Sequence, residues 1–129
     1  MRRVLGILYR EGEVLIGKRR GANKYIPRLT WTFPDEIVGE NESPRVKVKE
    51  AFKKKTGLTV RIKKFLFTSV PPENYKITDY YYWVEYVSGS LKSGGDIAEL
   101  KWVRPSELPK YFTTSIDYKV VEFLKSLEE

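Results

Sequence analysis

Hydrophobic and polar residues alternate over several short stretches of this chain, which is the pattern of half-buried β-strands. The predicted strands are residues 3–9, 14–16, 29–33, 58–70, 77–87 and 98–103. Glu11-Gly12-Glu13 separates the first two stretches and predicts a hairpin turn. The polar segments 17–28 and 34–43 predict loops.

Helical spacing of apolar residues appears in two places. Ser43 and Pro44 predict a helix start, because serine caps free backbone N–H groups and proline suits the first helical position. Gly57 predicts the end of this helix. Its expected buried stripe is Val48, Ala51 and Phe52. A short helical turn is predicted at Pro105, and a closing helix is predicted from Ile116, Val120, Val121, Phe123, Leu124 and Leu127.

The order of strands, helix, strands and helix predicts an α/β fold, with one mixed sheet flanked by helices. A length of 129 residues suits one domain spanning residues 1–129. The longest apolar runs are too short to span a membrane, and the chain does not open with a leader-like segment. The expectation is a cytoplasmic protein that does not bind membranes.

Composition narrows the possible chemistry. The chain has no cysteine and no histidine, which excludes disulfides, thiolate chemistry, zinc fingers and imidazole catalysis. Catalysis would rest on carboxylates, lysine, arginine, tyrosine or a metal held by oxygen atoms. A net charge of +7 favours an anionic partner. Charged residues reach 32% and glutamine is absent, which points to a thermophilic source.

Residues 31–58 resemble the signature of the Nudix hydrolase superfamily, the MutT-like proteins. The signature reads G-x5-E-x7-R-E-U-x-E-E-x-G-U, where U is a bulky aliphatic residue, and it usually follows a strand of the kind W-x-F/L-P. This chain has WTFP at 31–34, Glu42 at the first glutamate, Phe52 at the first U and TGL at 56–58. The segments VLIGKRR and AELKWV also lie where family members carry similar residues. The resemblance implies a Nudix-type α/β/α sandwich.

The residues that carry the family's chemistry differ here. Glu36 stands at the glycine, Glu50-Ala51 at the Arg-Glu pair, and Lys54-Lys55 at the Glu-Glu pair. Family members use these glutamates to hold divalent cations. A charged lysine has no acceptor, so it cannot ligate Mg²⁺. At about 5 Å and a dielectric near 20, one ammonium repels a divalent ion by roughly 6–7 kcal/mol. The resemblance therefore implies a degenerate Nudix box, with little or no Mg²⁺-dependent hydrolysis.

Three hypotheses follow. The first is a metal-independent binding module for a nucleotide or another diphosphate-containing ligand, with no cofactor. The expected ligand contacts are Lys18, Arg19, Arg20, Lys54 and Lys55. Surface charge typical of a thermophile explains these residues about equally well. Tyr25, Trp31 or the aromatic run 80–83 would stack a base, although sheet packing explains most of them better.

The second hypothesis is an active hydrolase of nucleoside diphosphates linked to another group, with Mg²⁺ or Mn²⁺ in a rearranged site. Its metal ligands would be Glu36, Glu42 and Glu50, and its catalytic residues Glu42 and Glu99. Glu99 also fits an exposed strand residue beside Lys101, and Glu50 fits a helical ion pair with Lys54.

The third hypothesis is a module that binds RNA or other nucleic acid through the basic helix 44–56, or one that binds a protein. Because the charges of this helix encircle it, nucleic acid ranks below a nucleotide as the expected partner. Family resemblance also makes a homodimer plausible.

Overall fold

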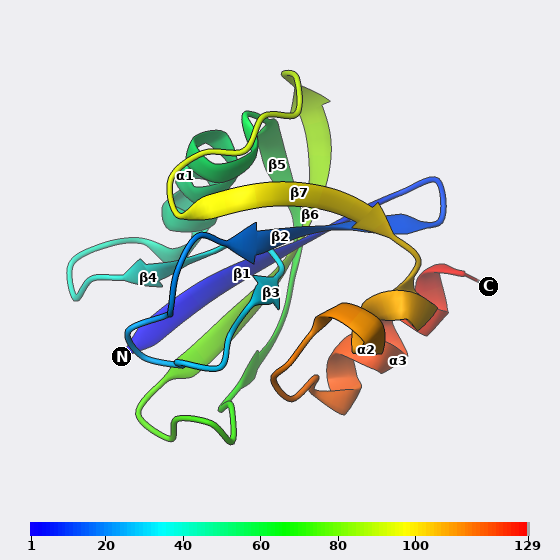
Figure 1. Cartoon of the computed structure of the whole chain (residues 1–129). Coiled ribbons are helices and arrows are strands. Elements are labelled where there is room, and N and C mark those ends of the chain that lie inside the picture. The colour runs from blue at the N-terminus through cyan, green and yellow to red at the C-terminus, as the bar shows by residue number, and fades with distance from the viewer. Residues whose placement is uncertain (129) are drawn as a thin grey trace.

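A computed structural model describes residues 1–128 and shows a mixed β-sheet with helices on both sides, an α/β/α sandwich (Figure 1). The strands are β1 (Arg2–Arg10), β2 (Glu13–Arg19), β3 (Trp31–Thr32), β4 (Asp35–Val38), β5 (Thr59–Ser69), β6 (Thr78–Ser88) and β7 (Ile97–Val103). The helices are α1 (Pro44–Thr56), the 3₁₀ turn η1 (Pro105–Glu107), α2 (Leu108–Tyr111) and α3 (Tyr118–Leu127). The predicted fold class is confirmed.

Strand β1 joins the two parts of the sheet. It runs parallel to β6 and antiparallel to β2 and β4, while β5 pairs with β6, and β3 and β7 pair with β2. The predicted hairpin between β1 and β2 is present. Its central residues Glu11 and Gly12 have φ of 51° and 84°, the positive values that a type I′ turn requires.

Helix α1 begins and ends where the sequence predicts. The Ser43 side chain accepts a hydrogen bond from the backbone N–H of Val46, and Gly57 closes the helix with φ of 76°. The expected stripe is buried, and Phe52 is fully inaccessible to solvent. Burial of a side chain of this size contributes roughly 1.5–3 kcal/mol. Phe52 packs so closely against β1 that a Cβ on Gly6 would lie 2.2 Å from its ring.

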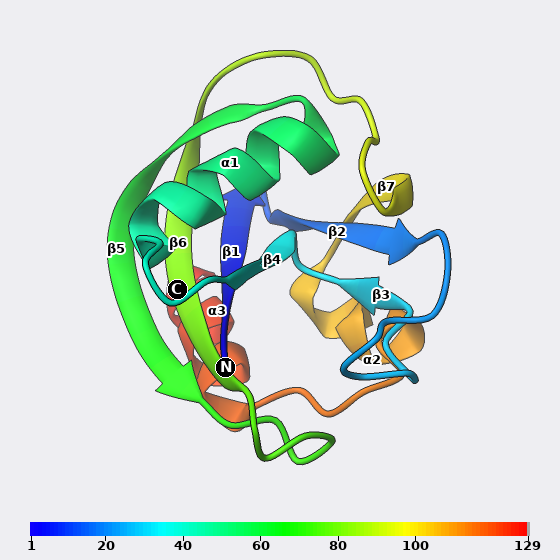
Figure 2. The ribbon, with the colours of Figure 1, turned by 90° about the vertical axis from the view of Figure 1, so that its left-hand side faces the viewer.

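Two large apolar clusters lie on opposite faces of the sheet, which α1 covers on one side and α3 on the other (Figure 2), and a smaller third cluster contains Ile26, Leu29 and Ile77. The first lies under α1 and includes Val48, Phe52, Val60 and Tyr82. The second lies under α2 and α3 and includes Leu108, Val120, Leu124 and Tyr81. The aromatic run of β6 therefore alternates between the two faces, which agrees with the period of a strand.

The segment 34–43, predicted to be a loop, contains strand β4. Asp35, Glu36, Ile37 and Val38 pair antiparallel with the first residues of β1. Two consecutive acidic residues disfavour a strand when only sequence is considered. Here Asp35 is buried against cationic side chains, so tertiary contacts override the local preference.

Other boundaries also differ from the prediction. The strand predicted at 29–33 is reduced to Trp31–Thr32, and β2 extends through Lys18 and Arg19, which were expected in a loop. Helix α3 starts at Tyr118 with Asp117 as its cap, and Val121 is exposed on it.

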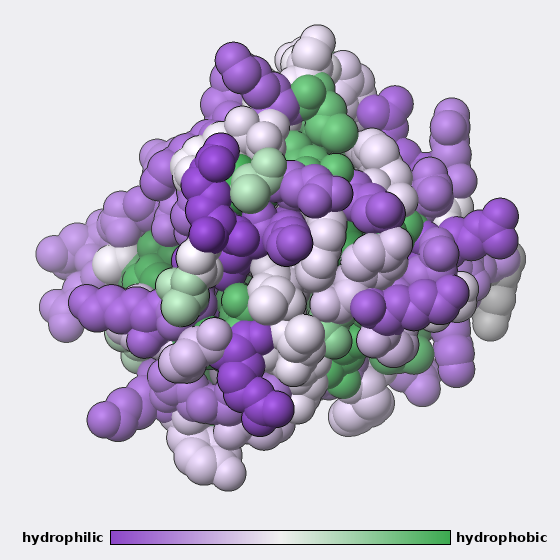
Figure 3. Space-filling model, viewed as in Figure 1, coloured by the Kyte–Doolittle hydropathy of each residue, from purple (hydrophilic) through white to green (hydrophobic). Residues whose placement is uncertain are grey.

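The face seen in Figure 3 is largely hydrophilic, with scattered apolar side chains. No helix within residues 1–128 is long and apolar enough to cross a membrane.

Candidate functional site

Strand β4 and the last turn of α1 bring oppositely charged side chains into contact. Asp35 is 3% exposed, and Lys55 is 2% exposed although lysine is rarely buried. The Lys55 Nζ atom donates to the main-chain oxygen of Asp35 at 2.5 Å and lies 3.3 Å from its Oδ1 atom. It also lies 4.0 Å from Oε2 of Glu36. The buried ammonium therefore lies among acceptors from β4.

The loop between β6 and β7 supplies a third carboxylate, that of Asp96. The N–H of Gly94 donates to the carbonyl of Lys55, and a Cβ on Gly94 would lie only 2.4 Å from the carbonyl of Lys54. Only glycine allows the loop to approach the end of α1 this closely. As a result, Oδ1 of Asp96 lies 3.1 Å from the Lys55 Nζ atom.

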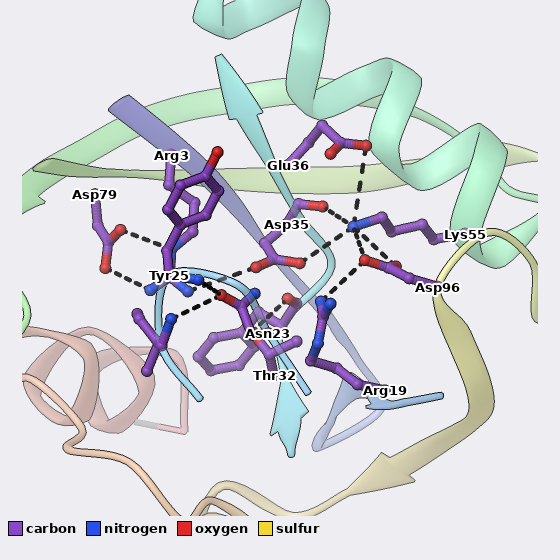
Figure 4. A network of polar contacts seen from close by, with 12 residues as sticks. Arg3, Arg19, Asn23, Tyr25, Thr32, Asp35, Glu36, Lys55, Asp79 and Asp96 are labelled. Atoms are coloured by element: carbon purple, nitrogen blue, oxygen red, sulfur yellow. Dashed lines mark hydrogen bonds and ion pairs between the residues drawn. The ribbon is translucent and has the colours of Figure 1, made fainter. Parts of the chain in front are cut away.

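These acceptors are called the Lys55 cage below: the carboxylates of Asp35, Glu36 and Asp96 and the main-chain oxygen of Asp35 (Figure 4). Burial alone lowers the pKa of the Lys55 ammonium, but the nearby charges of Asp35, Glu36 and Asp96 outweigh it and raise the pKa above 10.5. Lys55 is therefore a charged ammonium at neutral pH.

Arginines extend the network in two directions (Figure 4). Arg3 on β1 binds Asp79 on β6 through two bonds of 2.7 Å, and its Nη1 atom lies 3.5 Å from Asp35. Arg19 on β2 binds Asp96 at 2.9 Å. The pKa of Asp96 would be raised by burial, but Lys55 and Arg19 lower it below 3.8. Positive and negative groups thus alternate from Asp79 to Arg19.

A cavity of about 170 Å³ opens beside this network, and we call it the polar cavity. Its charged lining residues are Arg3, Arg19, Lys24, Lys55, Asp35, Glu36 and Asp96. Within residues 1–128, three buried side-chain atoms make no hydrogen bond: Arg3 Nη1, Arg19 Nε and Asp96 Oδ1. Two of them face opposite charges, because Arg3 Nη1 lies 3.5 Å from Asp35 and Asp96 Oδ1 lies 3.1 Å from the Lys55 Nζ atom, which leaves Arg19 Nε as the atom without such a partner. All three belong to residues that line this one cavity. Such unsatisfied groups are rare in folded proteins and cluster where a ligand or water completes the bonding.

A second cavity of about 250 Å³ adjoins the first, because Arg3 and Ile26 line both. Its walls carry five aromatic rings, and we call it the aromatic cavity. The rings belong to Trp31, Phe33, Tyr81, Phe112 and Tyr118. Tyr25 lines the polar cavity, and its backbone N–H donates to the Asn23 side chain. Polar and aromatic surfaces therefore meet within one region.

The predicted ligand-binding residues have different environments. Lys18 and Arg20 are exposed near the end of β2, whereas Arg19 is held by Asp96. The Lys54 side chain is 62% exposed and lies 3.5 Å from Glu36, while Lys55 is enclosed. Only Arg19 and Lys55 of the five line the polar cavity. Their role in binding a ligand remains a prediction.

The predicted metal ligands do not converge. Glu36 approaches Lys54, whereas Glu42 and Glu50 both approach Lys47, at 2.5 and 3.6 Å. Glu50 therefore lies nearest to Lys47 instead of the expected Lys54. Within the described chain, no group of three or more acidic side chains is placed to hold a metal ion. The arrangement does not fit the divalent cation that the family resemblance implies.

Glu99 is exposed on β7, which agrees with its interpretation as an exposed strand residue. The residue opposite it is Lys18 on β2, so a cross-strand neighbour replaces the expected Lys101. On the basic helix, Lys55 is buried and Lys47 is ion-paired, which leaves fewer cations for nucleic acid than the sequence suggested.

Sequence reasoning assigned no role to five residues of this network and its cavity: Arg3, Lys24, Asp35, Asp79 and Asp96. Arg3 and Asp79 lie in strands that carry other charged residues, Arg2 and Arg10 in β1 and Glu85 in β6, so the sequence does not single them out as a buried pair. Asp96 gave no signal either, because it lies in a polar, glycine-rich turn.

Comparisons with known proteins agree with this architecture. The family model described as the NUDIX domain matches residues 1–124. An ADP-ribose pyrophosphatase from Streptococcus suis superimposes with a TM-score of 0.75 at 13% identity, covering 99% of this chain and 92% of that one. A MutT protein from Methanosarcina mazei gives 0.73 at 19% identity, with coverages of 99% and 92%.

A UDP-X diphosphatase gives a TM-score of 0.75 at 16% identity, covering 99% of this chain and 62% of that one. No curated protein matches the sequence. At these identities, the structural matches establish the fold alone.

Proposed function

Because the chain belongs to the NUDIX family, we propose that it is a member that binds a nucleotide or other diphosphate-containing ligand with little or no metal-dependent hydrolysis. The polar cavity carries this proposal, because its lining combines the exposed Lys24 with Arg19 Nε, a buried donor without a hydrogen-bond partner in residues 1–128. A ligand or ordered water that entered the cavity would complete this bonding with a small shift of the side chains.

The charges around the polar cavity favour an anion at its rim. Lys24 lines the cavity and is exposed, and Lys54 is exposed beside Glu36. Arg3, Arg19 and Lys55 have carboxylate partners within the chain. A diphosphate is therefore expected to contact Lys24 and Lys54 first. Lys18 on β2 and Arg20, the residue after β2, lie nearby.

The Lys55 cage argues against ordinary hydrolysis. Cleavage of a diphosphate by a divalent cation requires carboxylates that hold the ion, so that it can neutralise charge and orient water. Here three carboxylates face an ammonium instead. Glu42 and Glu50, the other candidates, face Lys47.

The aromatic cavity favours a nucleotide over a simple diphosphate. A flat base can stack on rings such as Trp31 or Phe112, while its phosphates reach past the shared wall at Arg3 and Ile26. Two structural neighbours bear the names ADP-ribose pyrophosphatase and UDP-X diphosphatase. The aromatic cavity and the names of these neighbours together favour a nucleotide as the ligand.

The test is a panel of ADP-ribose, dinucleotides and nucleoside triphosphates, measured by thermal shift with a chelator present and by phosphate release with Mg²⁺ or Mn²⁺. At least one nucleotide should raise the Tm in the chelator, and release should stay at background. Lys24→Ala should weaken binding about tenfold, because it removes a charged hydrogen-bond donor at the cavity.

Lys49→Ala is the matched control, since Lys49 is an exposed lysine of α1 that does not line either cavity. Metal-dependent release that disappears in Glu42→Gln would replace this proposal with a rearranged hydrolase site. Failure of the whole panel to shift the Tm would reject nucleotide binding.

A further inference from the structure

Helix α1 and strand β5 form a groove on the outside of the molecule. Within residues 1–128, β5 pairs only with β6 at the edge of the sheet, and it curves round α1 from the end of the helix past its start (Figure 2). A hollow of about 420 Å³ lies between the two elements, and we call it the α1–β5 groove. It is lined by Val46, Lys49, Glu50, Lys53, Thr59 and Val60, none of which lines the polar or the aromatic cavity.

Apolar side chains form the floor of this groove and continue beyond it. Val60 is 2% exposed, whereas Val46, on the first turn of α1, is 54% exposed. Further along β5, Ile62 packs against the core cluster under α1, and Phe65 is 42% exposed. Phe65 lies opposite Tyr82 of the same cluster, so it faces the same side of the sheet. Adjoining exposed apolar residues along a groove are typical of a contact surface.

Cations border this apolar surface on the helix. Arg45, Lys49 and Lys53, which we call the basic row, follow at four-residue intervals and therefore share one face of α1, about 6 Å apart along its axis. None of the three makes an ion pair within residues 1–128, unlike Lys47. Glu50 is the one acidic residue that lines the groove, and it lies 3.6 Å from Lys47. The basic row therefore carries charge that the described chain leaves without a partner.

These features favour one class of occupant over three others. An added β-strand is disfavoured, because register shifts between Ile62 and Lys64 and between Phe65 and Phe67 interrupt the edge strand. A second copy of this chain is disfavoured, because each copy carries a net charge of +7.

Nucleic acid would match the basic row but not the floor of the groove. Its bases stack on flat aromatic rings, whereas the floor is formed by the aliphatic side chains of Val46 and Val60. An amphipathic helix matches both features, because its apolar face can cover the floor while acidic residues beside that face meet the cations.

We propose that the α1–β5 groove is a docking site for an acidic, amphipathic helical segment of a partner protein. The apolar side chains of the segment cover Val46, Val60 and Phe65, and its carboxylates pair with the basic row. Because the groove shares no lining residue with either cavity, the partner leaves the proposed nucleotide site open. This inference does not rest on the proposed function.

The test lets the protein select its own ligand. Immobilised full-length protein is presented with a phage library of random peptides of about 16 residues, which is enough for roughly four helical turns. Enriched peptides should carry a net negative charge and apolar residues at helical spacing. The most enriched peptide is then synthesised with a fluorescent label, and its affinity is measured by anisotropy at low and moderate salt.

Two variants locate the bound peptide. Lys53→Glu should weaken binding about tenfold or more, because it places a carboxylate against the carboxylates of the peptide. Val46→Ser should weaken binding about fivefold, because it removes exposed apolar surface from the floor. Lys110→Glu is the matched control, since it makes the same charge change at an exposed lysine of α2, on the other side of the sheet. It should leave the affinity within about twofold of wild type.

Several outcomes would overturn the proposal. These are a selection that enriches no peptide, enriched peptides without acidic residues, and equal losses of affinity in Lys53→Glu and Lys110→Glu. Binding of a single-stranded RNA oligonucleotide that Lys53→Glu abolishes and Val46→Ser leaves intact would assign the surface to nucleic acid instead. Self-association in light scattering that Val46→Ser abolishes would assign it to a second copy. All of these measurements omit nucleotide, so their failure is distinct from failure of the proposed function.

Discussion

The two ends of helix α1 carry the same kind of interaction in opposite surroundings. Near the start, Lys47 lies 2.5 Å from Glu42 and 3.6 Å from Glu50, whose side chains are 46% and 60% exposed. At the end, Lys55 lies among Asp35, Glu36 and Asp96 and is 2% exposed. Both lysines neutralise carboxylates, but Lys47 is 18% exposed and its partners are largely exposed, whereas Lys55 and its partner Asp35 are both buried.

Exposure decides what each lysine does for the fold. Water solvates Glu42 and Glu50 whether or not Lys47 is present, so this pair stabilises little. Asp35 has no such alternative, because its side chain is 4% exposed. Removing one partner of a buried ion pair leaves the other as an uncompensated charge. A count of ion pairs would treat the two ends as equal, although their energies differ.

The largest expected effect comes from Lys55→Met, which keeps the length of the side chain and removes the charge. It should lower the free energy of unfolding by about 3–5 kcal/mol, because Asp35 loses one of its two buried cations and keeps only Arg3, at 3.5 Å. For a protein of this size that corresponds to a fall in Tm of roughly 10–25 °C. Urea titration and calorimetry measure both quantities.

Lys47→Met is the control on the same helix, and it should change stability by only a small fraction of that amount. Equal losses of stability in the two variants would show that burial does not determine how much each lysine contributes to the free energy of unfolding.

The sequence predicts much of the fold because local signals agree with one another. Ser43, Pro44 and Gly57 mark α1, and Glu11-Gly12 marks the first hairpin, through backbone preferences that act within a few residues. Strand β4 escaped prediction because its stability comes from pairing with β1 and from the burial of Asp35 against Arg3 and Lys55. Such contacts depend on residues that are distant in the sequence.

The candidate site shows the same limit more strongly. The sequence places Lys54 and Lys55 at family metal positions but treats them as a similar pair. In the structure, one turns to solvent and the other is enclosed by carboxylates. The decisive partner is Asp96, 41 residues away, which the glycine-rich loop brings to the helix end. No short-range pattern encodes that approach.

An intermediate effect is expected in the pH dependence of the Lys55 interaction. The folded-state pKa of Lys55 is raised above 10.5, so its stabilisation is complete below that pH and is lost as pH rises through the folded pKa. The gap in unfolding free energy between wild type and Lys55→Met should stay constant up to pH 10.5. Between pH 10.5 and the folded pKa it should narrow by at most about 1.4 kcal/mol per pH unit, and above the folded pKa it should stay constant again.

Asp96→Asn tests the acid side of the same cage. Because Lys55 and Arg19 lower the pKa of Asp96 below 3.8, its stabilisation is present above that pH and is lost as pH falls through the folded pKa. The stability gap between wild type and Asp96→Asn should therefore close only below pH 3.8. A gap that closes near neutral pH would mean that the cage does not hold Asp96 in its charged form.

The smallest expected effect is that of Lys54→Ala. Lys54 is next to Lys55 in the sequence and stands at the first residue of the family's Glu-Glu pair. The Lys54 side chain is 62% exposed, and its one ion pair joins it to Glu36 at 3.5 Å. Glu36 keeps its contact with Lys55 and its access to water when Lys54 is absent. The Tm should therefore stay close to that of wild type, and added salt should reduce the small remaining difference, because salt screens exposed charges. A loss comparable to that of Lys55→Met would require Lys54 to share the neutralisation of Asp35. The cage would then hold two cations instead of one, and the two lysines would act as a single unit at this end of α1.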